Sequence, residues 1–216
     1  MNSKALAAVL AAAVSCLVIP AHAQKGAGKL GAYAGTFEVS GTERDPKVAY
    51  KATVKVNLPV TGRSANAIDA DFLGGEAPPA TIKVTQWDYF HREKSADSSG
   101  TFVETKCWLA GPVEVPALVI GVVNVDLRKK IYSMSLTLQS VKEVPFECSS
   151  TRQKSYRKNQ GIGFALGTGA PGMQAESPLP LADPARLAAK FTMDASRQSG
   201  GQVGPVFQEW DLRLSQ

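Results

Sequence analysis

Alternation of apolar and polar residues restricts the fold of this chain more than any other feature. In the stretch KVAYKATVKVNL, residues 47–58, every second residue from Val48 to Leu58 is apolar, and the residues between them are mostly lysine, threonine or asparagine. The stretch IYSMSLTLQS, residues 131–140, repeats the pattern. A period of two predicts strands that bury one face and expose the other.

Shorter runs of the same kind predict further strands. NAIDADFLG places Ile68, Ala70 and Phe72 on one face and two aspartates on the other. Other strands are expected at residues 34–40, 80–90, 101–109, 161–166, 190–195 and 206–214. About ten short strands with turn-rich connections indicate an all-β, single-domain antiparallel β-sandwich, with a barrel-like sheet as the alternative.

Two segments depart from simple alternation. VEVPALVIGVVNVDL, residues 113–127, is apolar on both faces, which predicts a central strand followed by a tight hairpin at 128–130. LADPARLAAKF, residues 181–191, is the helix candidate, with Asp183 as N-cap and Pro184 as the first helical residue. We expect at most one short helix, at this place.

The N-terminal residues have the pattern of a secretory signal peptide. An apolar run at 5–19 precedes Ala21-His22-Ala23, which puts small residues at both cleavage positions. A transmembrane anchor is one alternative, but the run is shorter than the roughly 20 residues that span a bilayer. Lipoprotein cleavage before Cys16 is another. We expect residues 1–23 to be a signal peptide and residues 24–216 to form one exported domain, periplasmic or secreted.

The expected mature chain keeps two cysteines, Cys107 and Cys148. An even pair in an exported protein predicts a disulfide, and two reduced structural thiols are the alternative. The bridge would close a loop of about 41 residues and stabilise the fold by roughly 4 kcal/mol in the chain-entropy model. Two cysteines and one mature histidine are too few soft ligands for a metal site, so none is expected.

The stretch VTQWDYFHREK, residues 84–94, contains the one histidine of the expected mature chain. Under strict alternation Trp87, Tyr89 and His91 form an outward row that could stack on sugar rings or flat ligands. A β-bulge near Thr85-Gln86 would instead turn the two aromatic residues inward. The similar QEWDLRL, where Trp210 shares an apolar face with leucines, favours burial. We expect His91 at a strand end, in solvent.

Two later stretches break the strand pattern. STRQKSYRKNQ, residues 150–160, is basic and polar, and is expected to be a loop that is either solvated or in contact with an acidic or phosphate-rich partner. Its candidate contact residues are Arg152, Lys154, Tyr156, Arg157 and Lys158. GTGAPGMQAESPLPLADP, residues 167–184, is rich in Gly and Pro and predicts a long loop, which is usually functional or disordered.

Signals for catalysis are weak. A nucleophile would need His91 as its base, and no G-x-S-x-G occurs. Ser155 to Lys158 matches S-x-x-K without the accompanying motifs. Asp69, Asp71 and Glu76 are interpreted as solvated carboxylates, with glycoside hydrolysis or calcium binding as alternatives. The glycine-rich GIGFALGTGAPG lacks the lysine of a phosphate-binding loop, so no cofactor is expected.

These observations favour an exported, non-enzymatic binding or interaction module of the cell envelope or extracellular space. The candidate ligand-binding residues are Trp87, Tyr89, His91 and the five residues of the basic stretch. The expected partner is an anionic envelope component or another protein, and not nucleic acid. One alternative is an envelope-polymer hydrolase that uses Asp and Glu residues. Another is a structural subunit of an exported assembly, if the apolar strand at 115–125 lies at a sheet edge.

Overall fold

The computed structural model of the chain describes residues 30–44, 47–73, 76–95, 100–168, 178–194 and 203–215. The expected signal peptide, Cys16 and residues 169–177 of the expected long loop lie outside these ranges. Within the ranges all regular elements are strands, and no helix is present that is long and apolar enough to cross a membrane.

Fourteen strands form one sheet, and all paired neighbours are antiparallel. Their bounds are β1 Ala32–Arg44, β2 Lys47–Pro59, β3 Gly62–Arg63, β4 Ala67–Asp71, β5 Pro79–Lys94, β6 Phe102–Trp108, β7 Val113–Asp126, β8 Ile131–Ser140, β9 Val144–Ser150, β10 Tyr156–Gln160, β11 Gly163–Gly167, β12 Leu179–Pro180, β13 Arg186–Asp194 and β14 Val203–Ser215.

The sheet branches at β5. Its long path runs β10-β9-β6-β5-β2-β1-β14-β13. On the side of β5 away from β2, residues Pro79–Val84 pair with β7 and residues Asp88–Lys94 pair with β6. The branch continues from β7 to β8, which also pairs with β11 and β12. One strand therefore starts two different sections of the sheet.

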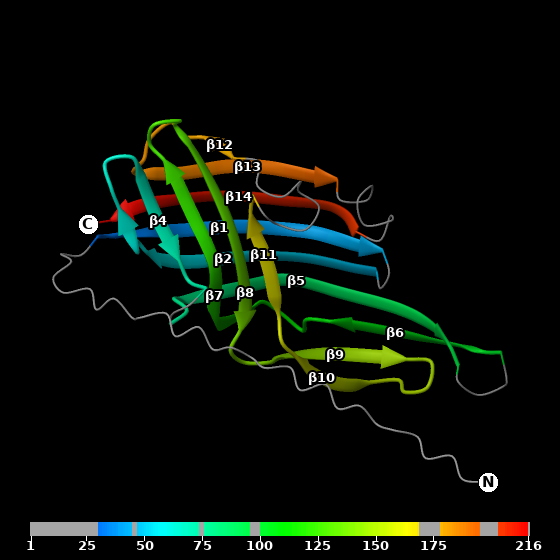
Figure 1. The fold of residues 1–216 in the computed structure, drawn as a ribbon. Coiled ribbons are helices and arrows are strands. Elements are labelled where there is room, and N and C mark those ends of the chain that lie inside the picture. The colour runs from blue at the N-terminus through cyan, green and yellow to red at the C-terminus, as the bar shows by residue number, and fades with distance from the viewer. Residues whose placement is uncertain are drawn as a thin grey trace, which may run out of the picture.

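The branch folds back over the long path. Figure 1 shows β7, β8 and β11 crossing over β1 and β2, so the sheet curls into a half-barrel. The all-β antiparallel prediction is confirmed. The sheet is continuous from one layer to the other, so the barrel-like alternative describes it better than a sandwich of two separate sheets.

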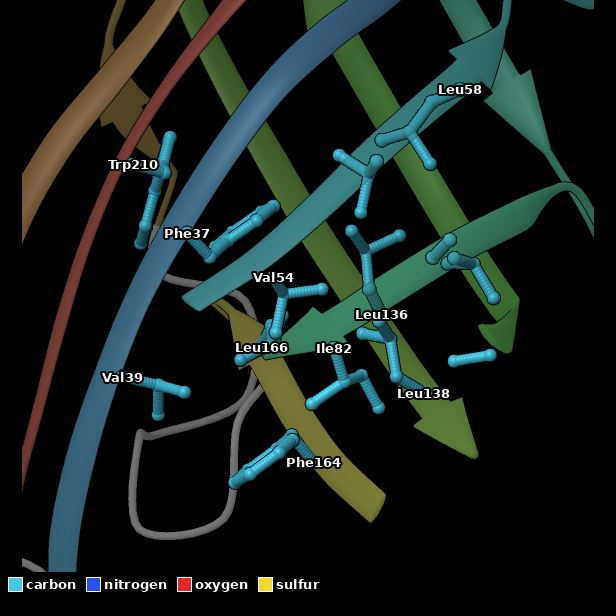
Figure 2. Close-up of a cluster of buried hydrophobic side chains, with 14 of the residues drawn as sticks. Phe37, Val39, Val54, Leu58, Ile82, Leu136, Leu138, Phe164, Leu166 and Trp210 are labelled. Carbon is cyan, nitrogen blue, oxygen red and sulfur yellow. The ribbon is translucent and has the colours of Figure 1, made fainter. Parts of the chain in front are cut away.

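The core lies between these two layers. Figure 2 shows Phe37, Val54 and Ile82 of the long path facing Leu136 and Leu166 of the branch. The alternation predicted for β2 and β8 is confirmed, since their inward residues are buried with the exception of the half-buried Tyr50. Packing of this kind makes burial of apolar area the main stabilising contribution in this part of the molecule.

Side-chain hydrogen bonds close one end of the half-barrel. The Tyr132 hydroxyl donates to the Ala188 carbonyl at 3.1 Å and accepts from the indole nitrogen of Trp210 at 3.3 Å. The Tyr33 hydroxyl donates to the Pro184 carbonyl at 2.8 Å. Burial raises the pKa of Tyr33 to about 12 and also raises that of Tyr132. Both phenols are thus held protonated as donors.

The predicted helix at residues 181–191 is wrong. The Asp183 carboxylate accepts the Ala185 N–H at 2.8 Å, and its carbonyl accepts the Arg186 N–H at 3.0 Å, which closes a turn. The chain then enters β13, where Leu187 is fully buried against the core. Asp-Pro starts turns as readily as helices, and the alternation from Leu187 onward decides for a strand.

The predicted central strand is confirmed as β7, which is paired on both edges. Its hairpin to β8 is also confirmed: one Asp126 carboxylate oxygen accepts the Arg128 and Lys129 N–H groups at 3.0 and 2.8 Å. The outward Leu118 and Ile120 are 44% and 49% exposed. No layer of the described residues therefore covers the outward face of β7, although that face is apolar.

Candidate functional site

Part of the sheet extends beyond the second layer. We call it the extension: residues Asp88–Lys94 of β5 together with β6, β9 and β10. In Figure 1 these strands lie beyond the lower ends of β7 and β8, and β7 and β8 do not pair with them. The inner face of the extension is therefore not closed by those strands, unlike the inner face of the half-barrel.

A β-bulge at the start of the extension decides which side chains face inward. Lys51 pairs with Gln86 and Ala52 with Val84, so Thr85 is an extra residue on β5. The bulge predicted near Thr85-Gln86 is confirmed. An extra residue shifts the alternation by one, which places Val84 and Trp87 on the same inner face.

Trp87 lies at the junction between the core and the extension. Its ring centre is 5.7 Å from that of Tyr50, 6.3 Å from Phe146 and 6.0 Å from Phe164. It is half-buried, whereas Trp210 in the half-barrel is 2% exposed. Trp87 is thus neither an exposed platform nor a fully buried core residue. It packs on the core with one part and borders open space with another.

That open space is a cleft of about 200 Å³ on the inner face of the extension. Register explains its composition, because Tyr89 pairs with Cys107, Cys107 with Cys148, and Cys148 with Tyr156 across four neighbouring strands. The cleft is lined by Trp87, Tyr89, His91, Glu93, Thr105, Cys107, Phe146, Tyr156, Lys158 and Gln160.

The predicted disulfide is present and lies in the floor of this cleft. Cys107 and Cys148 are bonded, with their Cα atoms 4.1 Å apart, and both are buried. They cross-link β6 to β9. Across the sheet, Cys107 pairs with Tyr89 on one side, and Cys148 pairs with Tyr156 on the other. The bond therefore holds together the two halves of the cleft, which come from distant parts of the chain.

The polar groups of the cleft carry charges of both signs. His91 is 33% exposed and its Nε2 lies 3.7 Å from a Glu93 carboxylate oxygen. His91 was expected in solvent at a strand end; it lies three residues before the end of β5 at Lys94 and is only partly exposed, with its ring centre 6.3 Å from that of Tyr89. Lys158 is exposed at the rim.

Of the five candidates in the basic stretch, the structure brings two to the cleft. Tyr156 and Lys158 face inward, whereas Arg157 faces outward, with a guanidinium nitrogen 3.7 Å from Glu147. Arg152 donates to the Ser95 hydroxyl and Lys154 is exposed in the turn before β10. The predicted loop at 150–160 is wrong in its second half, which is an edge strand.

The carboxylates at residues 69–76 do not form a site in the described part of the chain. Asp71 accepts the Leu73 N–H at 2.9 Å, which is a local turn contact. Ile68, Ala70 and Phe72 are buried as predicted. Among the described residues no group of three His, Cys, Asp or Glu side chains is arranged to hold a metal ion.

Five residues of the cleft were not among the sequence candidates: Glu93, Thr105, Phe146, Gln160 and, as a lining residue, Cys107. Phe146 carried a usable signal, because Val144, Phe146 and Cys148 alternate with polar or small residues. The other residues are recognisable only from the register of β5, β6 and β10. The chain matches no family model, no curated protein and no solved structure, so its function is inferred from the cleft itself.

Proposed function

We propose that this protein is an exported, non-enzymatic binding module of the cell envelope or extracellular space. Its ligand is a ring-bearing unit of an envelope polymer, such as a sugar, held in the cleft of the extension. The observation that carries the proposal is the convergence of Trp87, Tyr89 and Tyr156 with His91 and Lys158 in one hollow. Aromatic faces stack on sugar rings, and polar tips beside them donate and accept hydrogen bonds.

The size of the cleft supports a polymer unit over a whole small ligand. Its volume of about 200 Å³ is below the roughly 300–1,000 Å³ of pockets that enclose drug-sized molecules. One ring can enter while the rest of a polymer stays in solvent. Lys158 at the rim supplies a positive charge for an acidic substituent on that ring.

The lining supports binding over hydrolysis. Hydrolysis of a glycosidic bond by the usual route needs two carboxylates that flank the bond. Glu93 is the one carboxylate among the described residues that line the cleft. The structural-subunit alternative required the apolar strand at 115–125 to lie at an edge, and that strand is β7, which has partners on both sides.

Co-sedimentation of the purified mature protein with insoluble peptidoglycan, and titration with lipopolysaccharide and with a neutral glucan, test the proposal. We expect saturable binding to one of these polymers. Tyr156→Ala should weaken it roughly three- to tenfold, because a stacking contact is worth about 0.5–1.5 kcal/mol. Lys158→Gln should weaken it further if the bound unit is acidic.

Arg157→Gln is the matched control, since Arg157 is the neighbour of both residues on the same strand but faces outward. It should leave polymer binding unchanged. Binding that is insensitive to Tyr156→Ala, or absent for all three polymers, contradicts the proposal. Release of soluble saccharide from the polymer would favour the hydrolase.

A further inference from the structure

The outer face of the same strands carries a second hollow, which we call the outer groove. It has a volume of about 530 Å³, and its lining includes Lys47 and Ala49 of β2, Phe90 of β5, and Lys106 and Trp108 of β6. Register produces it: Phe90 pairs with Lys47 on one side and Lys106 on the other, while Asp88 pairs with Ala49 and Trp108. The small side chain of Ala49 leaves space beside the larger ones.

Aromatic rings next to cations are exposed along this face. Trp108 is 38% exposed and Phe102, on the same side of β6, is 49% exposed. The Arg92 guanidinium lies 4.3 Å from the ring centre of Phe102, and the Lys106 ammonium lies 5.8 Å from that of Phe90. The combination of exposed large rings and cations is the composition of residues that lie at a membrane interface.

A line of lysines continues from the groove along the outer face. Lys47, Lys51 and Lys55 stand at every fourth position of β2, and Lys83 of β5 lies beside Thr53 between the last two. We call these four residues the lysine stripe. The two four-residue intervals from Lys47 to Lys55 span about 26 Å on an extended strand, at roughly 3.3 Å per residue.

The lysine stripe differs from the cations elsewhere on the sheet. No carboxylate of the described residues is within ion-pair distance of any of its four lysines, whereas Lys190 lies 2.9 Å from Glu209 and Arg186 lies 2.8 Å from Asp211. The four lysines therefore have no direct ion-pair partner among the described residues, although Asp88, Glu38 and Glu114 stand beside them in the register, and their ammonium groups are available to an external anion.

We propose that the outer face of β2, β5 and β6 docks on an anionic phospholipid bilayer. The lysine stripe and Lys106 face the phosphate-bearing headgroups, and Trp108 and Phe102 lie at the level of the interface. Clustered lysines are attracted to anionic lipids, and tryptophan prefers the headgroup region. Ammonium groups act as point charges that suit mobile headgroups, whereas recognition of protein carboxylates favours the paired donors of arginine.

This docking does not depend on the proposed polymer binding and adds to it. Inward and outward side chains alternate along β5, so the cleft and the outer groove lie on opposite faces of the same strands. A molecule that rests on a bilayer through the outer groove leaves the cleft open on the far side.

Vesicle co-sedimentation of the purified mature protein tests the docking. Vesicles of phosphatidylglycerol mixed with phosphatidylcholine should bind the protein at low salt and release most of it at high salt, and vesicles of phosphatidylcholine alone should bind little. The triple variant Lys47→Gln, Lys51→Gln, Lys55→Gln should lower the affinity for the mixed vesicles roughly ten- to hundredfold. Trp108→Ser should lower it by a smaller factor.

The matched control is Lys129→Gln, Lys142→Gln, Lys154→Gln, which removes the same charge from exposed lysines outside the outer groove and the stripe. It should retain most of the vesicle binding. Equal losses in both triple variants, equal binding to neutral vesicles, or binding to soluble dextran sulfate in preference to vesicles overturn the proposal. Tyr156→Ala should not change vesicle binding, so the failure of polymer binding and the failure of docking are distinguishable.

Discussion

The half-barrel and the extension belong to one sheet but are stabilised in different ways. In the half-barrel a second layer covers the inner face, and almost every second residue of β8 is fully buried. In the extension β10 has no buried residue and β6 has one, Cys107, while β9 buries Val144, Phe146 and Cys148. β6 and β10 bury so little apolar area that they gain little to offset the entropy of ordering their backbone. The extension therefore depends more on its covalent cross-link.

The same difference explains where binding is possible. A face that is covered by a second layer is filled with side chains at the density of a packed core, and leaves no room for a ligand. The extension keeps two uncovered faces, with the cleft on one and the outer groove on the other. Function is thus expected in the part of the sheet that is least stable by itself.

The largest effect is expected at Trp210. Trp210→Ala removes a buried ring that packs on Phe37 and Phe191 and deletes the donor to Tyr132. We expect a loss of about 5 kcal/mol in the free energy of unfolding, at the upper end of the range for buried aromatic residues. Urea denaturation measures it. Trp108→Ala, at an exposed ring on the extension, should cost well under half as much.

Removal of the disulfide comes next. Cys107→Ser with Cys148→Ser should lower the free energy of unfolding by about 4 kcal/mol in the chain-entropy model, for a sequence separation of 41 residues. Because the bridge lies in the extension, hydrogen exchange should rise in β6, β9 and β10 more than in β8. A uniform rise across both regions would contradict the assignment of the disulfide to local stabilisation. Mass spectrometry with and without reductant first verifies the bridge.

The stability cost of Trp87→Ala should lie between the cost expected for a residue of the half-barrel and that expected for a residue of the extension. Its ring contacts the core through Phe164 and Tyr50 but also borders the cleft. We expect a loss of about 2–3 kcal/mol, below that of a fully buried tryptophan, together with weaker polymer binding. A cost equal to that of Trp210→Ala would make Trp87 a core residue, and a cost near zero would make it a platform.

The sequence was sufficient for the strands of the half-barrel because each buries one face, and burial imposes a period of two. It failed for β10, since a five-residue edge strand with every side chain at least partly exposed has no apolar pattern. It also failed at Asp183-Pro184, where turn and helix share the same start signal. The disulfide was predictable because the part of the chain after the expected signal peptide contains two cysteines, which leave one pairing.

The cleft was predictable only in part. Trp87, Tyr89 and His91 are close in the chain, and the similarity to the Trp210 stretch favoured the bulge that turns the first two inward. Their meeting with Tyr156 and Lys158 depends on the register of β5 with β6, β6 with β9 and β9 with β10. Such registers join residues far apart in the chain and leave no local signal.

The smallest effect concerns the closed end of the half-barrel at high pH. Burial raises the pKa of Tyr33 from 10.0 to about 12, because the buried phenolate would lose its water; the charge of Arg63 lowers the pKa in part and that of Asp183 raises it. A pKa that is higher in the folded state than in the unfolded state favours unfolding once the unfolded chain releases its proton. The stabilisation by protonated Tyr33 is therefore complete below pH 10 and is lost as the pH rises toward 12.

Tyr33→Phe tests this contribution. Near neutral pH the variant should be less stable by about 1 kcal/mol, since one hydrogen bond is missing. Between pH 10 and pH 12 the wild type should lose stability more steeply than the variant, by at most about 1.4 kcal/mol per pH unit for one proton. Urea midpoints measured across this window give both slopes, and Tyr132→Phe provides the comparison at the second buried phenol. Parallel slopes for the wild type and Tyr33→Phe would mean that the Tyr33 hydroxyl ionises in the folded state as readily as in the unfolded chain. The closed end would then be open to water, and the contrast between a sealed half-barrel and an accessible extension would not hold there.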